Sequence, residues 1–161
     1  MSEPLDSIDQ NILACLQENA RISNVELADR IGLSPAPCLR RVAALEKAGV
    51  IRQYVTLLDP DTMNLGVTVY VQVSLDLQAD KRFELFEKAV VKRPEVMECY
   101  VMTGDADYLL KVVVPDVSAY ERFLRTSLAR IEGVAGTRSS FALKQVKYST
   151  ALPMTSESRA D

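Results

Sequence analysis

Residues 23–51 carry the pattern that most constrains how this chain can fold. Ser23 and Glu26 have the spacing of a capping box, which predicts the start of a short helix. Gly32 suits the left-handed backbone that ends such a helix, and Ser34 suits the cap of a second one. Gly49 then predicts the end of that second helix. Two short helices joined by a tight turn are typical of a helix-turn-helix.

The second predicted helix has an inward and an outward face. Cys38, Val42 and Leu45 recur at i, i+4 and i+7, so we expect them to face the core. Small residues and arginines remain outside, where the helix N-terminus also favours a phosphate. The residues expected to contact double-stranded DNA are Ser34, Ala36, Pro37, Arg40 and Arg41, together with Lys47, Arg52 and Arg21. The alternative interpretation is a helical hairpin with two solvated arginines.

The distribution of charge fits a specific DNA-binding protein better than an indiscriminate one. The 161 residues allow one large domain or two small ones, and the formal net charge is −3. A polyanion repels such a protein at long range. Between Arg40 and Arg52, however, four basic residues stand against Glu46 alone. A small basic face on an acidic protein is typical of a DNA reader attached to a domain with another task.

The residue types that support catalysis and metal binding are scarce. The chain has no histidine, and its cysteines, Cys15, Cys38 and Cys99, form no C-x-x-C pair. We therefore expect no enzyme activity, no cofactor and no metal site, and a small ferredoxin-like enzyme fused to a helical arm is the weaker alternative. Residues 1–5 are too polar for a signal peptide, and no apolar run reaches membrane-spanning length. These features predict a cytoplasmic protein with reduced thiols and no membrane contact.

The elements predicted around the motif divide the chain into domains. Ser7 and Gln10 repeat the capping-box spacing and begin a third short helix before the motif. After Gly49, the apolar and β-branched segment 51–58 predicts the strand of a small wing or a linker strand that pairs with a partner subunit. The predicted divisions are a helix-turn-helix domain at 1–58, a hinge at 59–66, a ferredoxin-like domain at 67–148 and a polar, fraying tail at 149–161.

The second half of the chain predicts a sandwich of one sheet and two helices. Strict alternation of apolar residues over 67–77 indicates a strand with one buried face. The elements that follow are a helix at 83–90, strands at 96–102 and 108–114, a helix at 118–131 capped by Ser118 and Glu121, and a strand at 134–146. Right-handed crossovers then give an α+β fold, an N-terminal winged helix-turn-helix plus a C-terminal ferredoxin-like βαββαβ sandwich.

The sheet of such a sandwich has one face without helices. Tyr70, Tyr100 and apolar neighbours are expected on that face. Because so much apolar surface is unfavourable in water, we predict that a second copy of the chain covers it and that the protein is a homodimer.

Two stretches of the sequence resemble a known family. The run SNVELADRIGLSPAPCLRRVAALEKAGVIRQYVTLLDP is similar to the helix-turn-helix of the leucine-responsive/asparagine-operon (Lrp/AsnC) regulators, and closer to the leucine-responsive branch. The run TGDADYLLKVVVPD resembles the glycine–aspartate loop of their amino-acid-sensing domain. The likeness extends from about Leu5 to Leu152.

The resemblance implies a DNA-binding transcription regulator that forms dimers and often rings of four dimers. In that family a free amino acid commonly binds between dimers and changes assembly or DNA affinity. Leucine or another apolar amino acid is the first candidate. The family's effector positions fall on Thr103, Gly104, Asp105, Asp107, Tyr108, Thr137, Ser139 and Ser140. One departure is Ala106, where relatives often have an aromatic residue, which implies a wider or shallower pocket.

The chemistry of the loop gives a separate reason to expect a zwitterionic ligand. Gly104 permits a sharp turn that exposes backbone N–H groups to a carboxylate. Asp105 and Asp107 would attract an α-ammonium group, and Lys111 is the nearest cation in the sequence. The alternative is that the loop is merely a polar hairpin turn, since glycine and aspartate dominate such turns. The corresponding alternative function is an architectural DNA-binding protein of the same fold without an effector.

Overall fold

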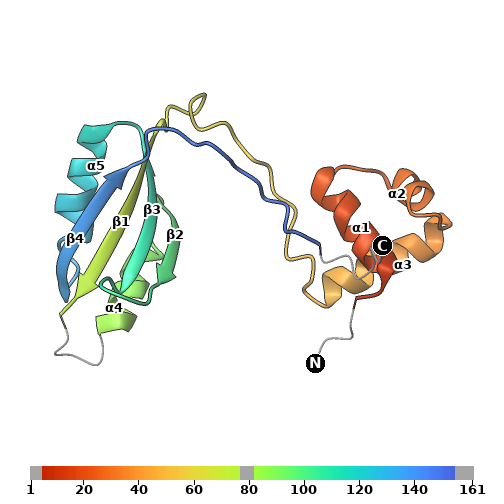
Figure 1. Cartoon of the computed structure of the whole chain (residues 1–161), viewed down its shortest axis with the longest axis horizontal. Helices are drawn as coiled ribbons and strands as arrows, with labels where there is room; N and C mark the ends of the chain where they lie inside the picture. The colour runs from red at the N-terminus through yellow and green to blue at the C-terminus, as the bar shows by residue number, and fades with distance from the viewer. Residues whose placement is uncertain (1–4, 77–81, 155–161) are drawn as a thin grey trace, which may run out of the picture. The chain divides into compact units, whose positions relative to one another are not determined.

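The computed structural model describes residues 5–76 and 82–154, which form two compact units (Figure 1). Among the described residues, the helical unit comprises 5–56 together with 147–154, and the sheet unit comprises 57–76 and 82–146. The predicted Leu77 end of the first strand lies outside the described residues.

The helical unit is built from α1 (Ser7–Glu18), α2 (Asn24–Arg30) and α3 (Pro35–Lys47). Each helix contributes its apolar stripe to one core, as the periodicity of the sequence predicts. The buried residues of this core are Ile12, Leu27, Ala28, Cys38 and Leu45. Gly32 has φ +69° and lets the chain turn sharply between α2 and α3.

One of the three predicted capping boxes is confirmed, and two are wrong. In the confirmed box, the Glu26 N–H donates to Ser23 Oγ at 3.2 Å and the Ser23 N–H donates to Glu26 Oε2 at 3.1 Å. At α1 the cap is Asp6, which accepts from the Asp9 N–H, so Ser7 is already helical. The helix predicted at 118–131 is likewise capped by an aspartate, Asp116, whose carboxylate accepts from the Ala119 N–H. In both cases the carboxylate stands before the predicted serine and satisfies a free N–H group itself.

Replacing Ser23 by alanine is therefore expected to destabilise the helical unit by about 1 kcal/mol, because the Glu26 N–H loses its acceptor and the Glu26 carboxylate loses the Ser23 hydroxyl as a donor. The matched control is Ser7→Ala, which removes a hydroxyl that caps nothing and should change stability by less than about 0.5 kcal/mol. Chemical denaturation followed by circular dichroism measures both changes. Equal losses in the two variants would contradict the assignment of the caps.

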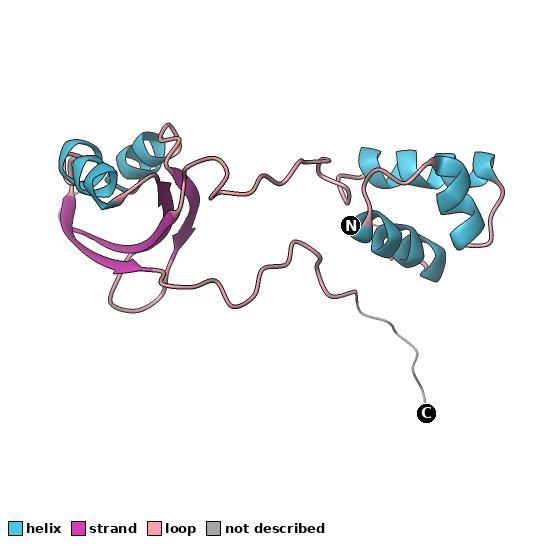
Figure 2. Cartoon of the chain, turned by 90° about the horizontal axis from the view of Figure 1, so that it is seen from above, coloured by secondary structure: helices cyan, strands magenta, loops and turns pink. Residues whose placement is uncertain are grey.

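The sheet unit has the predicted element order. Its strands are β1 (Val67–Leu75), β2 (Val96–Val101), β3 (Tyr108–Val114) and β4 (Val134–Phe141), and its helical segments are α4 (Arg82–Val90), α5 (Val117–Phe123) and the π-helical turn η1 (Leu124–Leu128). The strands lie in the order β2-β3-β1-β4 with antiparallel neighbours. Both α4 and α5 cover the same face of the curved sheet (Figure 2). The fourth strand ends at Phe141, paired with Val69, rather than at residue 146, and one further backbone hydrogen bond joins the Ala142 N–H to the Thr68 carbonyl at 2.9 Å.

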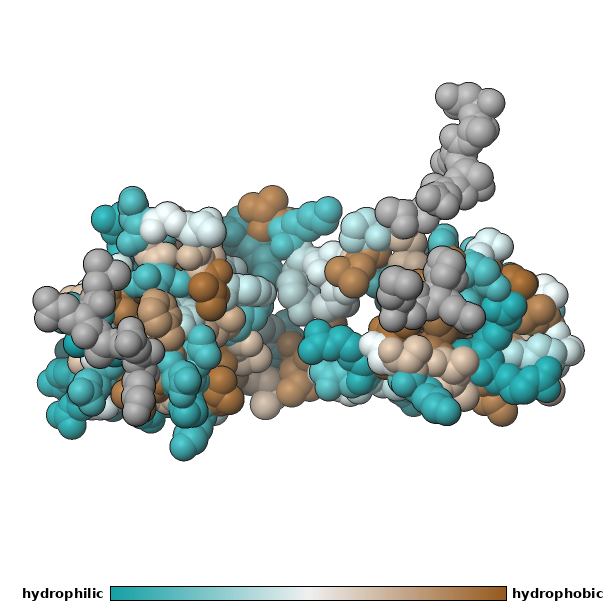
Figure 3. Space-filling model, turned by 90° about the horizontal axis from the view of Figure 1, so that it is seen from below, coloured by the Kyte–Doolittle hydropathy of each residue, from teal (hydrophilic) through white to brown (hydrophobic). Residues whose placement is uncertain are grey.

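Alternation along the central strands separates a dry face from an open one. Val69, Val71 and Val73 are fully buried under the helices. The helices contribute Phe86, whose ring centroid lies 4.5 Å from that of Tyr108. On the open face, in contrast, apolar side chains remain accessible. Apolar groups lie among polar ones on the surface of both units (Figure 3).

The segments flanking the sheet contain no strand within the described residues. Residues 51–58, predicted as a wing strand or a linker strand, form no strand ladder with any described residue, although the Tyr54 hydroxyl donates to Glu46 Oε1 at 2.9 Å. The predicted fraying tail has a contact instead: the Leu152 N–H donates to Gln17 Oε1 at 2.6 Å, and Gln17 Nε2 donates to the Leu152 carbonyl at 3.2 Å. The described end of the chain therefore docks on α1 inside the helical unit.

Candidate functional site

The first candidate site is the outward face of α3, which follows the tight turn of the helix-turn-helix. The Leu33 N–H donates to the Ala28 carbonyl at 2.9 Å and closes the turn. Ser34 occupies the N-cap position without a side-chain cap bond, so its hydroxyl is available to other partners. Pro35 takes the first helical position, where its missing N–H costs nothing.

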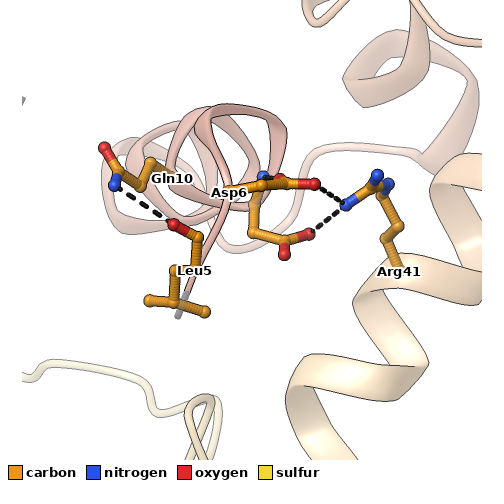
Figure 4. A network of polar contacts seen from close by, with 5 residues as sticks. Leu5, Asp6, Gln10 and Arg41 are labelled. Atoms are coloured by element: carbon orange, nitrogen blue, oxygen red, sulfur yellow. Dashed lines mark hydrogen bonds and ion pairs between the residues drawn. The ribbon is translucent and has the colours of Figure 1, made fainter. Parts of the chain in front are cut away.

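Most of the predicted DNA-contacting residues are exposed on this unit. The exposed ones are Ser34, Ala36, Arg40, Lys47, Arg52 and Arg21, while Pro37 is half-buried. Arg41 does not face outward as predicted. Its guanidinium is turned toward α1, where it pairs with Asp6 and Asp9 (Figure 4). A hydrogen bond from the Asp9 N–H and then the Arg41 pair lower the pKa of Asp6.

The second candidate site begins with the turn between β2 and β3. Gly104 has φ +111°, a conformation that side chains other than glycine rarely adopt. The Met102 N–H donates to the Asp107 carbonyl at 2.8 Å and closes the turn. The Asp107 N–H donates to the Val73 carbonyl at 2.9 Å, and Asp107 Oδ2 accepts from the Leu75 N–H at 2.6 Å. Asp107 thus fixes the turn against the end of β1.

A hollow of about 380 Å³ lies where this turn meets the end of β1 and the start of β4. Strand pairing brings these segments together, since Gln72 of β1 is opposite both Leu109 of β3 and Arg138 of β4. The residues that line the hollow are Gln72, Ser74, Met102, Thr103, Asp105, Ala106, Leu109, Gly136, Thr137 and Arg138. The site therefore combines one carboxylate, one guanidinium and a partly apolar wall.

The structure brings only part of the predicted effector set to this hollow. Thr103, Asp105 and Thr137 line it, and Gly104 shapes the turn beside it. The other predicted residues, Asp107, Tyr108, Ser139 and Ser140, do not line it.

Tyr108 and Ser139 belong to the helix-covered face instead. Tyr108 is buried, and its hydroxyl donates to Glu87 Oε1 at 2.8 Å. Burial and then this hydrogen bond raise the pKa of Tyr108. The Ser139 hydroxyl pairs with that of Tyr120. Both side chains point away from the hollow, because successive residues of a strand point to opposite faces of the sheet.

The cation of the hollow is Arg138 rather than the predicted Lys111. Lys111 Nζ forms an ion pair with Glu98 Oε1 at 2.9 Å on the open face of the sheet, and this contact lowers the pKa of Glu98. Arg138 lies between two predicted site residues in the sequence, but its chemistry did not single it out. The pairing of β1 with β4 places it opposite Gln72, and no pattern along the sequence reveals this register.

Residues 5–76 and 82–154 contain neither a cluster of metal ligands nor a membrane-spanning helix. No cluster of three or more histidine, cysteine or acidic side chains in these ranges could hold a metal ion. Across the same residues, no helix combines the length and the apolar character needed to cross a membrane.

The comparisons with known proteins match both units. A family model described as "Lrp/AsnC ligand binding domain" matches residues 68–152, and one described as "Winged helix-turn-helix DNA-binding" matches residues 5–52. The leucine-responsive regulatory proteins of Klebsiella pneumoniae and Escherichia coli K12 are each 48% identical to the chain over 148 residues, covering 92% of this chain and 90% of the relative.

Solved structures give the same result. A transcriptional regulator from Neisseria meningitidis, crystallised with L-methionine, has a TM-score of 0.91 and 45% identity, covering 94% of this chain and 98% of the other. AsnC of E. coli has a TM-score of 0.86 and 25% identity, covering 93% of this chain and 99% of the other. These relatives are regulators rather than enzymes. The chain therefore belongs to the Lrp/AsnC family of DNA-binding transcription regulators with an amino-acid-binding domain.

Proposed function

We propose that a free amino acid binds in the hollow beside the β2–β3 turn and thereby alters the assembly or the DNA affinity of this regulator. The observation that carries this proposal is the presence of Asp105 and Arg138 in the same hollow. The carboxylate is a partner for an α-ammonium group, and the guanidinium is a partner for an α-carboxylate. The L-methionine complex of the relative from N. meningitidis supports a ligand of this class.

The wall of the hollow favours an apolar amino acid. Met102, Ala106 and Leu109 supply its apolar part, and Ala106 leaves room that a larger residue would occupy. Leucine and methionine are the first candidates, because a branched or unbranched chain of this size fits the volume. A ligand with a charged side chain would bury that charge against these residues without a partner.

The proposed assembly follows from the open face of the sheet. Tyr70 is 40% exposed and Tyr100 is 52% exposed on that face, and we propose that a second copy covers them. A tetramer of such dimers would place a ligand at the junction between dimers. The ligand would then favour one assembly over another through its unequal affinity for the two.

The proposed DNA interface is the exposed set on the helical unit. Ser34, Ala36, Pro37 and Arg40 would enter the major groove at the start of α3. Lys47, Arg52 and Arg21 would contact phosphates and make the affinity strongly dependent on salt. Two such units in a dimer would read a pseudo-palindrome, in the cytoplasm where the chromosome lies.

A thermal-shift screen with the twenty amino acids, followed by calorimetry, tests the effector. L-leucine or L-methionine is expected to stabilise the protein by about 2.7 kcal/mol at a hundredfold excess over Kd. L-leucinamide, which lacks the carboxylate, and 4-methylpentanoate, which lacks the ammonium group, are matched controls and should give little stabilisation. Absence of heat with every amino acid would favour the architectural DNA-binding alternative.

A further inference from the structure

The first three turns of α3 carry two neighbouring arginines and no other charged residue. Arg40 is exposed beside Ala36 and Leu39, and Leu39 is 58% exposed. The outward surface of these turns is thus small and apolar apart from one guanidinium. Its shape permits close approach to a groove, and Arg40 is the group on it that can pair with guanine or phosphate.

Arg41 has a different environment from its neighbour. Its Nη1 lies 2.8 Å from Asp6 Oδ2 and 2.8 Å from Asp9 Oδ1, both at the start of α1 (Figure 4). The Arg41 side chain is 34% exposed and that of Asp9 only 20%. Two carboxylates against one guanidinium leave a local charge of −1. Both hydrogen bonds are donated by Nη1, and a phosphate that approached the rest of the guanidinium would be repelled by the two carboxylates beside it.

A second polar contact acts on the same end of α3. Asn24, the first residue of α2, donates through Nδ2 to the Pro35 carbonyl at 2.8 Å. The first turn of α3 is thus tied to α2, and its second turn is tied to α1 through Arg41. The orientation of α3 in the helical unit depends on both ties, in addition to the apolar core.

We propose that Arg40 contacts DNA and that Arg41 is a positioning residue, which holds α3 against α1 through Asp6 and Asp9. This division rests on the DNA-binding function of the family and assigns different tasks to adjacent residues of the same type. Arg40 contributes to affinity and base preference directly. Arg41 contributes by fixing the angle at which the reading surface of α3 is presented.

A variant with unchanged net charge tests the division. Arg41→Gln with Asp9→Asn removes one charge of each sign and leaves two amides that can hydrogen-bond to each other. The probe is a duplex that the wild-type protein selects from a randomised pool, and its affinity is measured over a series of salt concentrations.

We expect the double variant to bind within about threefold of wild type with an unchanged salt dependence, whereas Arg41→Gln alone binds more weakly. Arg40→Gln is the matched comparison and should lose at least about tenfold in affinity. Equal losses in Arg41→Gln and in the double variant, with the salt slope reduced by about 0.9 per bound arginine, would overturn the proposal by showing that Arg41 contacts phosphate.

Thermal unfolding of Arg41→Gln, Asp9→Asn and the double variant tests the ion pair between Arg41 and Asp9 in the absence of DNA. The effects of Arg41→Gln and Asp9→Asn on the folding equilibrium constant should be non-additive by about threefold to fivefold. Strict additivity of the two effects would overturn the positioning role of Arg41, whether or not a duplex had been selected. Failure of the protein to select any duplex would instead count against DNA binding.

Discussion

Asp105→Ala is expected to cut the stabilisation of the protein by an amino acid from about 2.7 kcal/mol to about 0.4–1.4 kcal/mol at the same ligand concentration, while leaving its unfolding free energy within about 0.5 kcal/mol of wild type. Asp105 is exposed at the hollow and makes no side-chain hydrogen bond among those found in the described residues. Its loss therefore costs the fold little. A charge-assisted contact to the α-ammonium group is worth about 1.5–3 kcal/mol, so Kd should rise by about tenfold to a hundredfold.

Asp107→Ala, two residues further on, is expected to have the opposite phenotype. Its carboxylate accepts from the partly buried Leu75 N–H, and truncation leaves that group without a partner. The cost should be about 1–3 kcal/mol of stability in the sheet unit. Denaturant unfolding and calorimetry with L-leucine and L-methionine separate the two phenotypes. If Asp107→Ala lost ligand binding at full stability, while Asp105→Ala kept it, the assignment of the two aspartates would be reversed.

The sequence predicts those features that depend on neighbours along the chain. The alternation of valines with polar residues in β1 identifies its buried face, and the Ser23–Glu26 spacing identifies the start of α2. Gly104 marks the turn for the same reason, because a local backbone conformation requires it. In each case the information lies within a few residues.

The features that the sequence does not predict depend on partners far along the chain. Arg138 enters the hollow because β1 and β4 pair in a particular register, which no local pattern reveals. The partners of Arg41 lie 32 and 35 residues before it, so helical periodicity places its backbone correctly but not its guanidinium. The functional assignment of a long side chain therefore needs its tertiary partners.

Phe86→Ala is expected to give the largest loss of stability, about 3–5 kcal/mol in the sheet unit, because a fully buried ring leaves a cavity that its neighbours fill only in part. The ring packs 4.5 Å from that of Tyr108, which directly follows Asp107, so the cavity also loosens the support of the β2–β3 turn. Amino-acid binding should weaken along with the fold. The matched control is Phe83→Ala, because Phe83 is 45% exposed and its ring centroid lies 6.1 Å from that of Tyr108. Differential scanning calorimetry should show a fall in Tm of more than about 10 °C for Phe86→Ala and a clearly smaller fall for Phe83→Ala. Similar falls in both would mean that Phe86 does not support the turn through a close-packed core.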